Sequence, residues 1–216
     1  MQIIDHNGRE AKRLQKWLGK NRYNGAYYYS VEIGKFFIPK IRTRRNWVTV
    51  GTKQALDHSI VFVHETLSGP DCWRKYEHFF KFRDVVYVVS VHDNLEQFAP
   101  HGHAVYLPLS VDTKYVEKFK REKDRGTAFA GRDEWRQGIE FPDGIDYIGM
   151  VPREELLSEM ARYRTVYAEC RTAIEAKVLG CDVVKYHPLF AGEPFDVLDS
   201  RDAARMLQAL LDEVDR

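Results

Sequence analysis

The chain has 216 residues, of which 44% are hydrophobic and 30% are charged. This composition supports a buried core and excludes wholesale disorder, and the length allows one large α/β domain or two small ones. The net charge is only +1, but residues 1–110 hold 16 basic against 10 acidic side chains, whereas residues 111–216 hold 17 against 22. We therefore expect two units with different partners. The partner of the first, basic unit should be anionic.

Targeting and redox features point to a cytoplasmic protein. No apolar run reaches the roughly 18 to 20 residues that span a bilayer, and residues 1–13 lack the apolar centre of a signal peptide. Cys72, Cys170 and Cys181 are too widely spaced for a disulfide framework or a zinc site. We expect reduced, packed cysteines and no bound metal.

Short β-branched or aromatic runs alternate with helical patterns along the chain. The predicted strands are residues 47–50, 59–63, 85–90, 104–107, 127–130, 146–148, 165–168 and 182–185. The predicted helices are residues 9–20, 72–82, 153–163, 172–179 and 201–214. Because strand and helix take turns, the pattern predicts an α/β fold with parallel sheets covered by helices.

A domain boundary is predicted near residues 108–112, where a strand ends and the charged stretch 114–125 begins as a linker with an exposed helix. We expect two small Rossmann-like domains, 1–110 and 111–200, with a ligand cleft between them, followed by a terminal segment, 201–216. Its helix should pack through one apolar face that consists of Met206, Leu207, Leu210, Leu211 and Val214.

The second half contains a candidate phosphate site. A predicted strand runs into Gly131 and Arg132, where glycine allows close approach of a ligand and arginine can donate twice to phosphate oxygens. Another strand leads through Arg171 and Thr172 into a helix, whose N-terminus favours negative charge. Glu175, one turn into that helix, would accept the hydroxyl groups of a ribose.

The same junction has a purely structural interpretation. Thr172 and Glu175 have the spacing of a capping box, in which the glutamate reaches back to the threonine amide. Gly180 would then end the helix in a left-handed conformation.

The order of these segments resembles the C-terminal domain of GT-B glycosyltransferases, particularly the retaining glycosyltransferase group 1. The matching residues are Gly131-Arg132, Gly149, the helix 153–163, Glu169 to Glu175, Gly180 and Val183-Val184. The resemblance implies a hexosyltransferase with a nucleotide-diphosphate sugar as donor, UDP-sugar first, and no cofactor or metal. It also implies that Glu169 contacts the donor sugar. Five residues separate Glu169 from Glu175, fewer than the family usually has.

His92 is our candidate acid or base in the first half. It follows the predicted strand 85–90, and histidine titrates near neutral pH. A structural role for this strand-end histidine is the alternative.

The basic residues Arg42, Arg44 and Arg45 are the candidate acceptor site. They could neutralise phosphates of DNA that carries a hydroxymethylated base, as in viral DNA glycosyltransferases. A lipid-linked acceptor at an anionic membrane surface would use the same residues. A protein that binds nucleotides without catalysis, a separate nucleic-acid-binding module and a merely solvated loop remain the other interpretations.

Overall fold

The computed structural model describes residues 32–33, 46–48, 57–63, 76–131, 138–149 and 151–216. Within these residues the chain divides into two compact units. The first contains the described residues up to Pro108 together with Arg201–Arg216, and the second contains Leu109–Ser200. No helix in the described part of the chain is long and apolar enough to cross a membrane.

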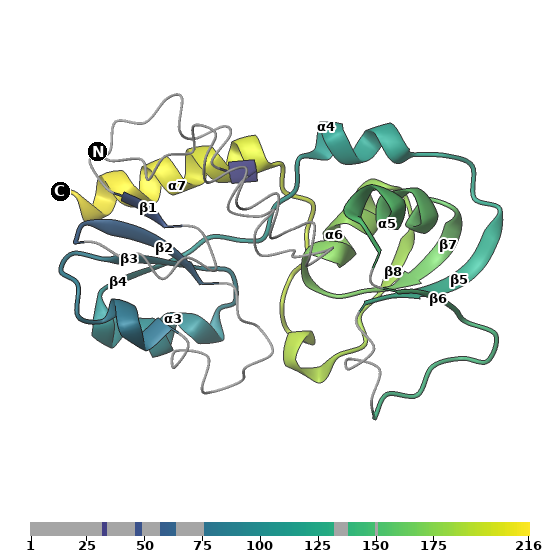
Figure 1. Cartoon of the computed structure of the whole chain (residues 1–216), viewed down its shortest axis with the longest axis horizontal. Helices are drawn as coiled ribbons and strands as arrows, with labels where there is room; N and C mark the ends of the chain where they lie inside the picture. The colour runs from purple at the N-terminus through teal and green to yellow at the C-terminus, as the bar shows by residue number, and fades with distance from the viewer. Residues whose placement is uncertain (1–31, 34–45, 49–56, 64–75, 132–137, 150) are drawn as a thin grey trace. The chain divides into compact units, whose positions relative to one another are not determined.

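The first unit contains a four-stranded parallel sheet in the order β1-β2-β3-β4 (Figure 1). Its strands are β1 (Asn46–Val48), β2 (Ser59–Val63), β3 (Val86–Val89) and β4 (His103–Tyr106). Its helices are α3 (Asp93–Phe98), η3 (Ala99–His101) and α7 (Ser200–Val214), of which α7 returns from the end of the chain. In Figure 1, α3 and α7 lie on different sides of the strands.

The two central strands of this sheet, β2 and β3, are buried on both faces. Val61, Val63, Tyr87 and Val89 point into a core cluster that includes Phe98 of α3. The alternate residues of the two central strands, Ile60, Phe62, Val86 and Val88, are equally inaccessible. Strands with two buried faces read as continuous apolar runs, which is why these segments were recognisable in the sequence.

Helix α7 buries most of the predicted face, with Met206 as the exception. Leu207 and Leu211 are fully buried together with Ala203, at a spacing of four residues. Met206 is 40% exposed, so its predicted place in the interface is wrong. Met206 is one residue from Leu207, which turns it about 100° away from the buried stripe.

The second unit contains another four-stranded parallel sheet, in the order β6-β5-β7-β8. Its strands are β5 (Arg125–Ala130), β6 (Asp146–Ile148), β7 (Tyr163–Tyr167) and β8 (Asp182–Val184). Its helices are α4 (Thr113–Val116), η4 (Glu117–Phe119), α5 (Arg153–Met160), α6 (Cys170–Val178) and η6 (Pro188–Phe190). Figure 1 shows α5 and α6 beside this sheet.

The α/β class with parallel sheets is confirmed, and each predicted strand overlaps an observed one. The helix expected in the charged stretch is only the short α4–η4 segment, and residues 120–124 have no regular structure. Helix α3 was not predicted, because its six residues are too few to show helical periodicity. The predicted helix 9–20 lies outside the described residues.

Two segments of the second unit pair where the chain enters and leaves it. Val111 and Asp199 form a parallel bridge, and Ser200 donates its backbone N–H to the Val111 carbonyl at 2.9 Å. The hydroxyl groups of Ser110 and Ser200 lie 3.2 Å apart. These contacts hold the first and last residues of the unit side by side.

Candidate functional site

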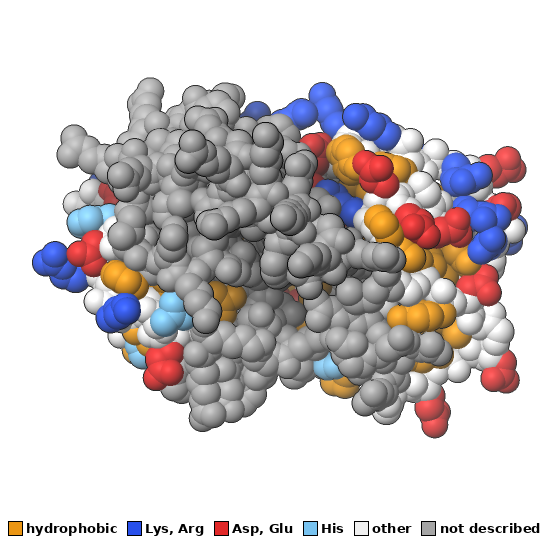
Figure 2. Space-filling model, viewed as in Figure 1, with side chains coloured by type: hydrophobic (Ala, Val, Ile, Leu, Met, Phe, Trp, Pro, Cys, Tyr) orange, Lys and Arg blue, Asp and Glu red, His pale blue; other side chains and the backbone are white. Residues whose placement is uncertain are grey.

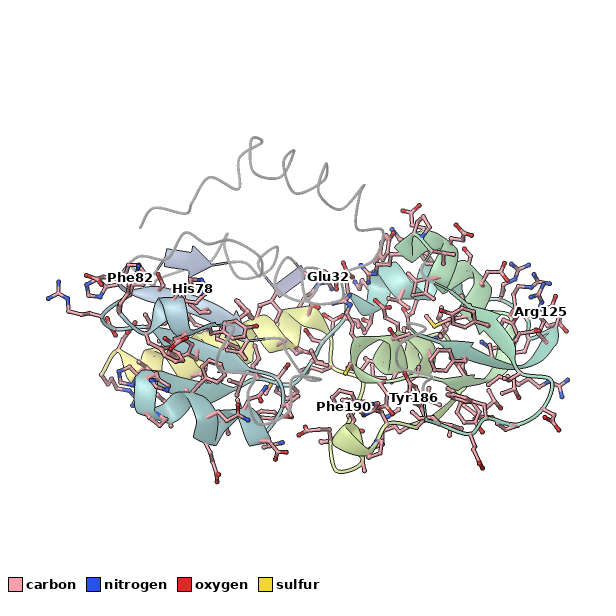
Figure 3. The ribbon with its side chains drawn as sticks, turned by 60° about the horizontal axis from the view of Figure 1, so that its bottom comes forward. Glu32, His78, Phe82, Arg125, Tyr186 and Phe190 are labelled. Carbon is pink, nitrogen blue, oxygen red and sulfur yellow. The ribbon has the colours of Figure 1, made fainter. Side chains whose placement is uncertain are left out.

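The carboxyl edge of the second sheet is the candidate site. Gly131 follows β5, Gly149 follows β6, Glu169 lies two residues beyond β7 and Tyr186 two residues beyond β8. Because the strands are parallel, these residues all lie at the same edge, where open α/β sheets bind ligands. Figure 3 labels Tyr186 near this edge and Arg125, the first residue of β5, at the far side of the unit.

Glu169 is the best-placed polar side chain at this edge. Its Oε1 accepts backbone hydrogen bonds from Tyr186 at 2.5 Å and from His187 at 2.7 Å. Its Oε2 is buried and has no hydrogen-bond partner within the described part of the chain. Burial raises the pKa of this carboxyl group. The backbone hydrogen bonds from His187 and Tyr186 and the positive charge of Lys185 lower it, but by less. The second oxygen therefore has an unmet hydrogen-bonding capacity in the interior of the unit.

Helix α6 begins beside this carboxylate. Glu169 is the N-cap residue and its side chain makes no capping hydrogen bond, so Thr172 is the third residue of the helix. The capping box proposed for Thr172 and Glu175 is therefore wrong. Cys170, the first helical residue, has a φ of 53°. A non-glycine residue in this left-handed region at a strand-to-helix turn is typical of functional sites in α/β folds.

Aromatic rings surround the end of β5. Phe129 stacks on Tyr147 at a centroid distance of 5.7 Å and meets Phe141 and Tyr186 edge-on. A side-chain carbon at Gly131 would lie 2.8 Å from the Phe129 ring and 3.2 Å from the Tyr186 hydroxyl. Glycine is thus needed for the rings to close over this strand end, while the approach of a ligand to Gly131 stays a prediction.

The Tyr186 hydroxyl belongs to the same group of atoms. It is buried, and no partner for it occurs among the described residues. Burial and then the negative charge of Glu169 raise its pKa, so the phenol stays protonated at neutral pH. Tyr186 and Glu169 therefore offer one hydroxyl and one carboxylate oxygen at the edge of the sheet.

Glu175 and Arg171 lie deeper than their predicted roles suggest. Glu175 is fully buried, and its Oε1 accepts from Arg171 Nε at 3.0 Å and from Arg153 Nε at 3.1 Å. Arg171 also donates to the Ser110 carbonyl at 3.1 Å, which ties α6 to the segment that enters the unit. A ribose could reach Glu175 only after one of these ion pairs opened.

Other predicted residues are placed as follows. Thr172 is partly exposed in the first turn of α6. Arg132, Arg42, Arg44 and Arg45 lie outside the described residues. Among the described residues no group of three or more His, Cys, Asp or Glu side chains could hold a metal ion.

His92 belongs to the first unit, at the carboxyl end of β3. It is the N-cap residue of α3 and is exposed, with its ring stacked on Tyr106 at a centroid distance of 3.8 Å. The neighbouring Ser90 hydroxyl is buried and has no partner among the described residues. The position of His92 at a strand end agrees with the sequence prediction, while its catalytic role stays a prediction.

Sequence reasoning missed Tyr186, His187 and Arg153. Tyr186 and His187 lie two and three residues beyond β8, and the rule that ligands bind beyond parallel strand ends would have selected them. Arg153 gave no such signal, because its role depends on the packing of α5 against α6. Burial lowers the pKa of His187, which favours a neutral imidazole beside the candidate site.

Comparison of the chain with models of known protein families gave no match, and comparison with curated proteins gave none either.

Proposed function

We propose that the chain is a GT-B-type glycosyltransferase, which moves a hexose from a nucleotide-diphosphate donor, most simply a UDP-sugar, to an acceptor. The observation that carries this proposal is the carboxyl edge of the second sheet. There a buried Glu169 carboxylate with one unpartnered oxygen lies at the N-terminus of helix α6. A ligand with hydroxyl groups and phosphates matches this pairing of an acceptor with a helix dipole.

In this proposal the sugar hydroxyls bind Glu169 Oε2 and the Tyr186 hydroxyl, which lack partners among the described residues. The diphosphate lies at the start of α6 near Thr172, with Gly131 allowing the approach and Arg132 supplying charge. Arg171 and Glu175 do not contact the donor in this proposal. Their buried ion pair fixes the orientation of α6.

The transfer itself requires stabilisation of the departing diphosphate. An acceptor oxygen attacks the anomeric carbon, the bond to the diphosphate oxygen breaks, and the acceptor proton passes to a base. The positive end of α6 and Arg132 stabilise the leaving charge. His92, exposed at a strand end of the first unit, is the proposed base.

The proposed acceptor is a polyanion. Our first choice is DNA with a hydroxymethylated base, and the alternative is a lipid-linked acceptor at an anionic membrane surface. The support is the basic excess of residues 1–60, which hold 12 basic and 4 acidic side chains. Arg42, Arg44 and Arg45 are among the basic ones. Over the second unit, Figure 2 shows acidic and basic side chains interspersed. The basic excess of residues 1–60 is therefore the reason to propose an anionic acceptor.

A nucleotide-binding protein without catalysis is the second candidate. The observation in its favour is the burial of Glu175 in ion pairs with Arg153 and Arg171. Of Glu169 and Glu175, only Glu169 would then contact a ligand.

The deciding experiment measures donor hydrolysis and sugar transfer with a panel of nucleotide sugars. The acceptors are hydroxymethylated duplex DNA and anionic vesicles with lipid acceptors. Glu169→Gln is compared with Glu154→Gln, whose carboxylate is exposed and accepts from the Tyr115 hydroxyl. Turnover that falls at least tenfold only in Glu169→Gln supports the proposal. Donor binding without hydrolysis or transfer favours the second candidate, and absence of any nucleotide-sugar binding refutes both.

A further inference from the structure

Lys123 connects the ends of two helices at the amino edge of the second sheet. It lies two residues before β5, and its Nζ donates to the Ala161 carbonyl at 2.9 Å and to the Leu179 carbonyl at 3.0 Å. Ala161 and Leu179 are the C-cap residues of α5 and α6. A cation is favoured there, because helix C-termini carry partial negative charge.

The third neighbour of this Nζ is a thiol. Cys181 directly precedes β8, and its Sγ lies 3.2 Å from Lys123 Nζ although 58 residues separate the two. The thiol also donates to the Met160 carbonyl at 3.4 Å, and the side chain of Cys181 is 7% exposed. Four backbone elements thus fix an amine and a thiol in contact.

We propose that Lys123 and Cys181 form a covalent nitrogen–sulfur cross-link when the protein meets a peroxide. In the first step the Cys181 sulfur attacks one peroxide oxygen, the O–O bond breaks, and sulfenic acid and water form. The sulfur is oxidised by two electrons and the peroxide is reduced. In the second step the Lys123 ammonium gives one proton to water, the resulting amine attacks the sulfur, the S–O bond breaks, and the departing hydroxide takes a proton from nitrogen. Thiol, amine and hydrogen peroxide give one S–N bond and two water molecules.

The position of the pair explains why condensation competes with further oxidation of the sulfur. A sulfenic acid that is buried against an amine meets that amine before it meets a second peroxide, because the two atoms already touch. Burial raises the pKa of Cys181, and the hydrogen bond from Lys123 opposes this. The raised pKa keeps the sulfur in its less reactive thiol form, so its oxidation by peroxide is slow.

The cross-link is independent of the proposed function. Lys123 and Cys181 precede their strands, whereas Gly131 and Tyr186 follow theirs, so the two sites lie at opposite edges of the sheet. The link would join residues 123 and 181 and constrain the unfolded chain between them.

The chain offers a matched control for each partner. Cys170 is also 7% exposed and lies at the other edge of the sheet. Lys185 resembles Lys123, because its Nζ donates to the carbonyls of Phe190, Ala191 and Glu193.

The test treats the purified full-length protein with hydrogen peroxide and analyses its proteolytic peptides by mass spectrometry. We expect a peptide pair joined at Lys123 and Cys181, lighter by two hydrogen atoms than the sum of its parts and separated by a thiol reductant. It should exceed any other lysine–cysteine pair at least tenfold. Lys123→Arg and Cys181→Ser should lose it, while Lys185→Arg and Cys170→Ser should keep it.

The wild-type protein alone can overturn the proposal, so a variant that fails to fold does not obscure the result. Recovery of Cys181 as sulfinic or sulfonic acid with Lys123 unlinked would show that condensation does not compete. An equal yield of the cross-link in urea-unfolded protein would show that the fold does not direct it.

Discussion

The carboxylate of Glu169 accepts a hydrogen bond from the backbone N–H of His187 at 2.7 Å, across 18 residues of sequence. This contact joins the residue before α6 to the residues that follow β8. It aligns one oxygen of the carboxylate and leaves the other without a partner among the described residues. The orientation of Glu169 is therefore set by backbone donors and does not depend on a ligand.

The first prediction concerns Glu169 and pH. Its folded-state pKa is raised, chiefly by burial, so the folded protein binds a proton at pH values where the unfolded chain has lost it. The free energy of unfolding should therefore fall as pH rises from the ordinary glutamate pKa through the folded-state pKa. Urea unfolding across the acid range measures this, and Glu169→Gln should flatten that part of the curve. The same slope in wild type and variant would assign the effect to another group.

The second prediction contrasts two glycines of one strand region. Gly131→Ala places a methyl group 2.8 Å from the buried Phe129 ring, so we expect a loss of about 1–3 kcal/mol in unfolding free energy. Gly126→Ala, with nothing within 4 Å, should be neutral or stabilising by about 0.4–1 kcal/mol. Denaturant unfolding of both variants checks the difference. Equal stabilities would mean that the rings around Gly131 can shift freely.

The third prediction concerns the buried carboxylate of Glu175. Glu175→Gln should lower the free energy of unfolding by about 3–5 kcal/mol, because Arg153 and Arg171 then lose their common counter-charge in the interior. Asp202→Asn is the control, since its pair with Arg205 is exposed and should contribute little. Thermal and urea unfolding measure both. A small effect at Glu175 combined with lost nucleotide affinity would restore its predicted ribose contact.

The fourth prediction concerns Tyr87, whose hydroxyl is buried and has no partner in the described part of the chain. Burial raises its pKa from 10.0 to about 12, so the folded state keeps a proton that the unfolded state releases. Stability should fall as pH rises between these two values. Tyr87→Phe should remove this fall and raise the free energy of unfolding by about 1 kcal/mol near neutral pH. Alkaline unfolding curves for both proteins give the comparison, and a destabilised phenylalanine variant would reveal a partner for the hydroxyl.

The fifth prediction separates two neighbours on helix α7. Leu207→Ala should reduce the free energy of unfolding by about 2–5 kcal/mol, because this side chain is fully buried. Met206→Ala should change it by less than about 0.5 kcal/mol, since Met206 faces solvent. Equal effects would indicate that the helix is rotated from its described position.

The sequence by itself determined the fold class and the approximate strands. Segments such as Ser59–Val63 and Val86–Val89 have both faces buried, and this requirement appears in the sequence as uninterrupted apolar runs. It also located the junction at Glu169 and the left-handed stop at Gly180, whose φ is 79°. These features depend on local geometry, which a few consecutive residues specify.

Only the tertiary structure decided which polar groups meet. Lys123 and Cys181 touch across 58 residues, and Glu175 pairs with Arg153 of the preceding helix. Such contacts depend on strand order and helix packing, and periodicity carries no information about either. The exposure of Met206 on α7 was also decided by tertiary packing, because Met206 and Leu207 are both apolar and only one of them is buried.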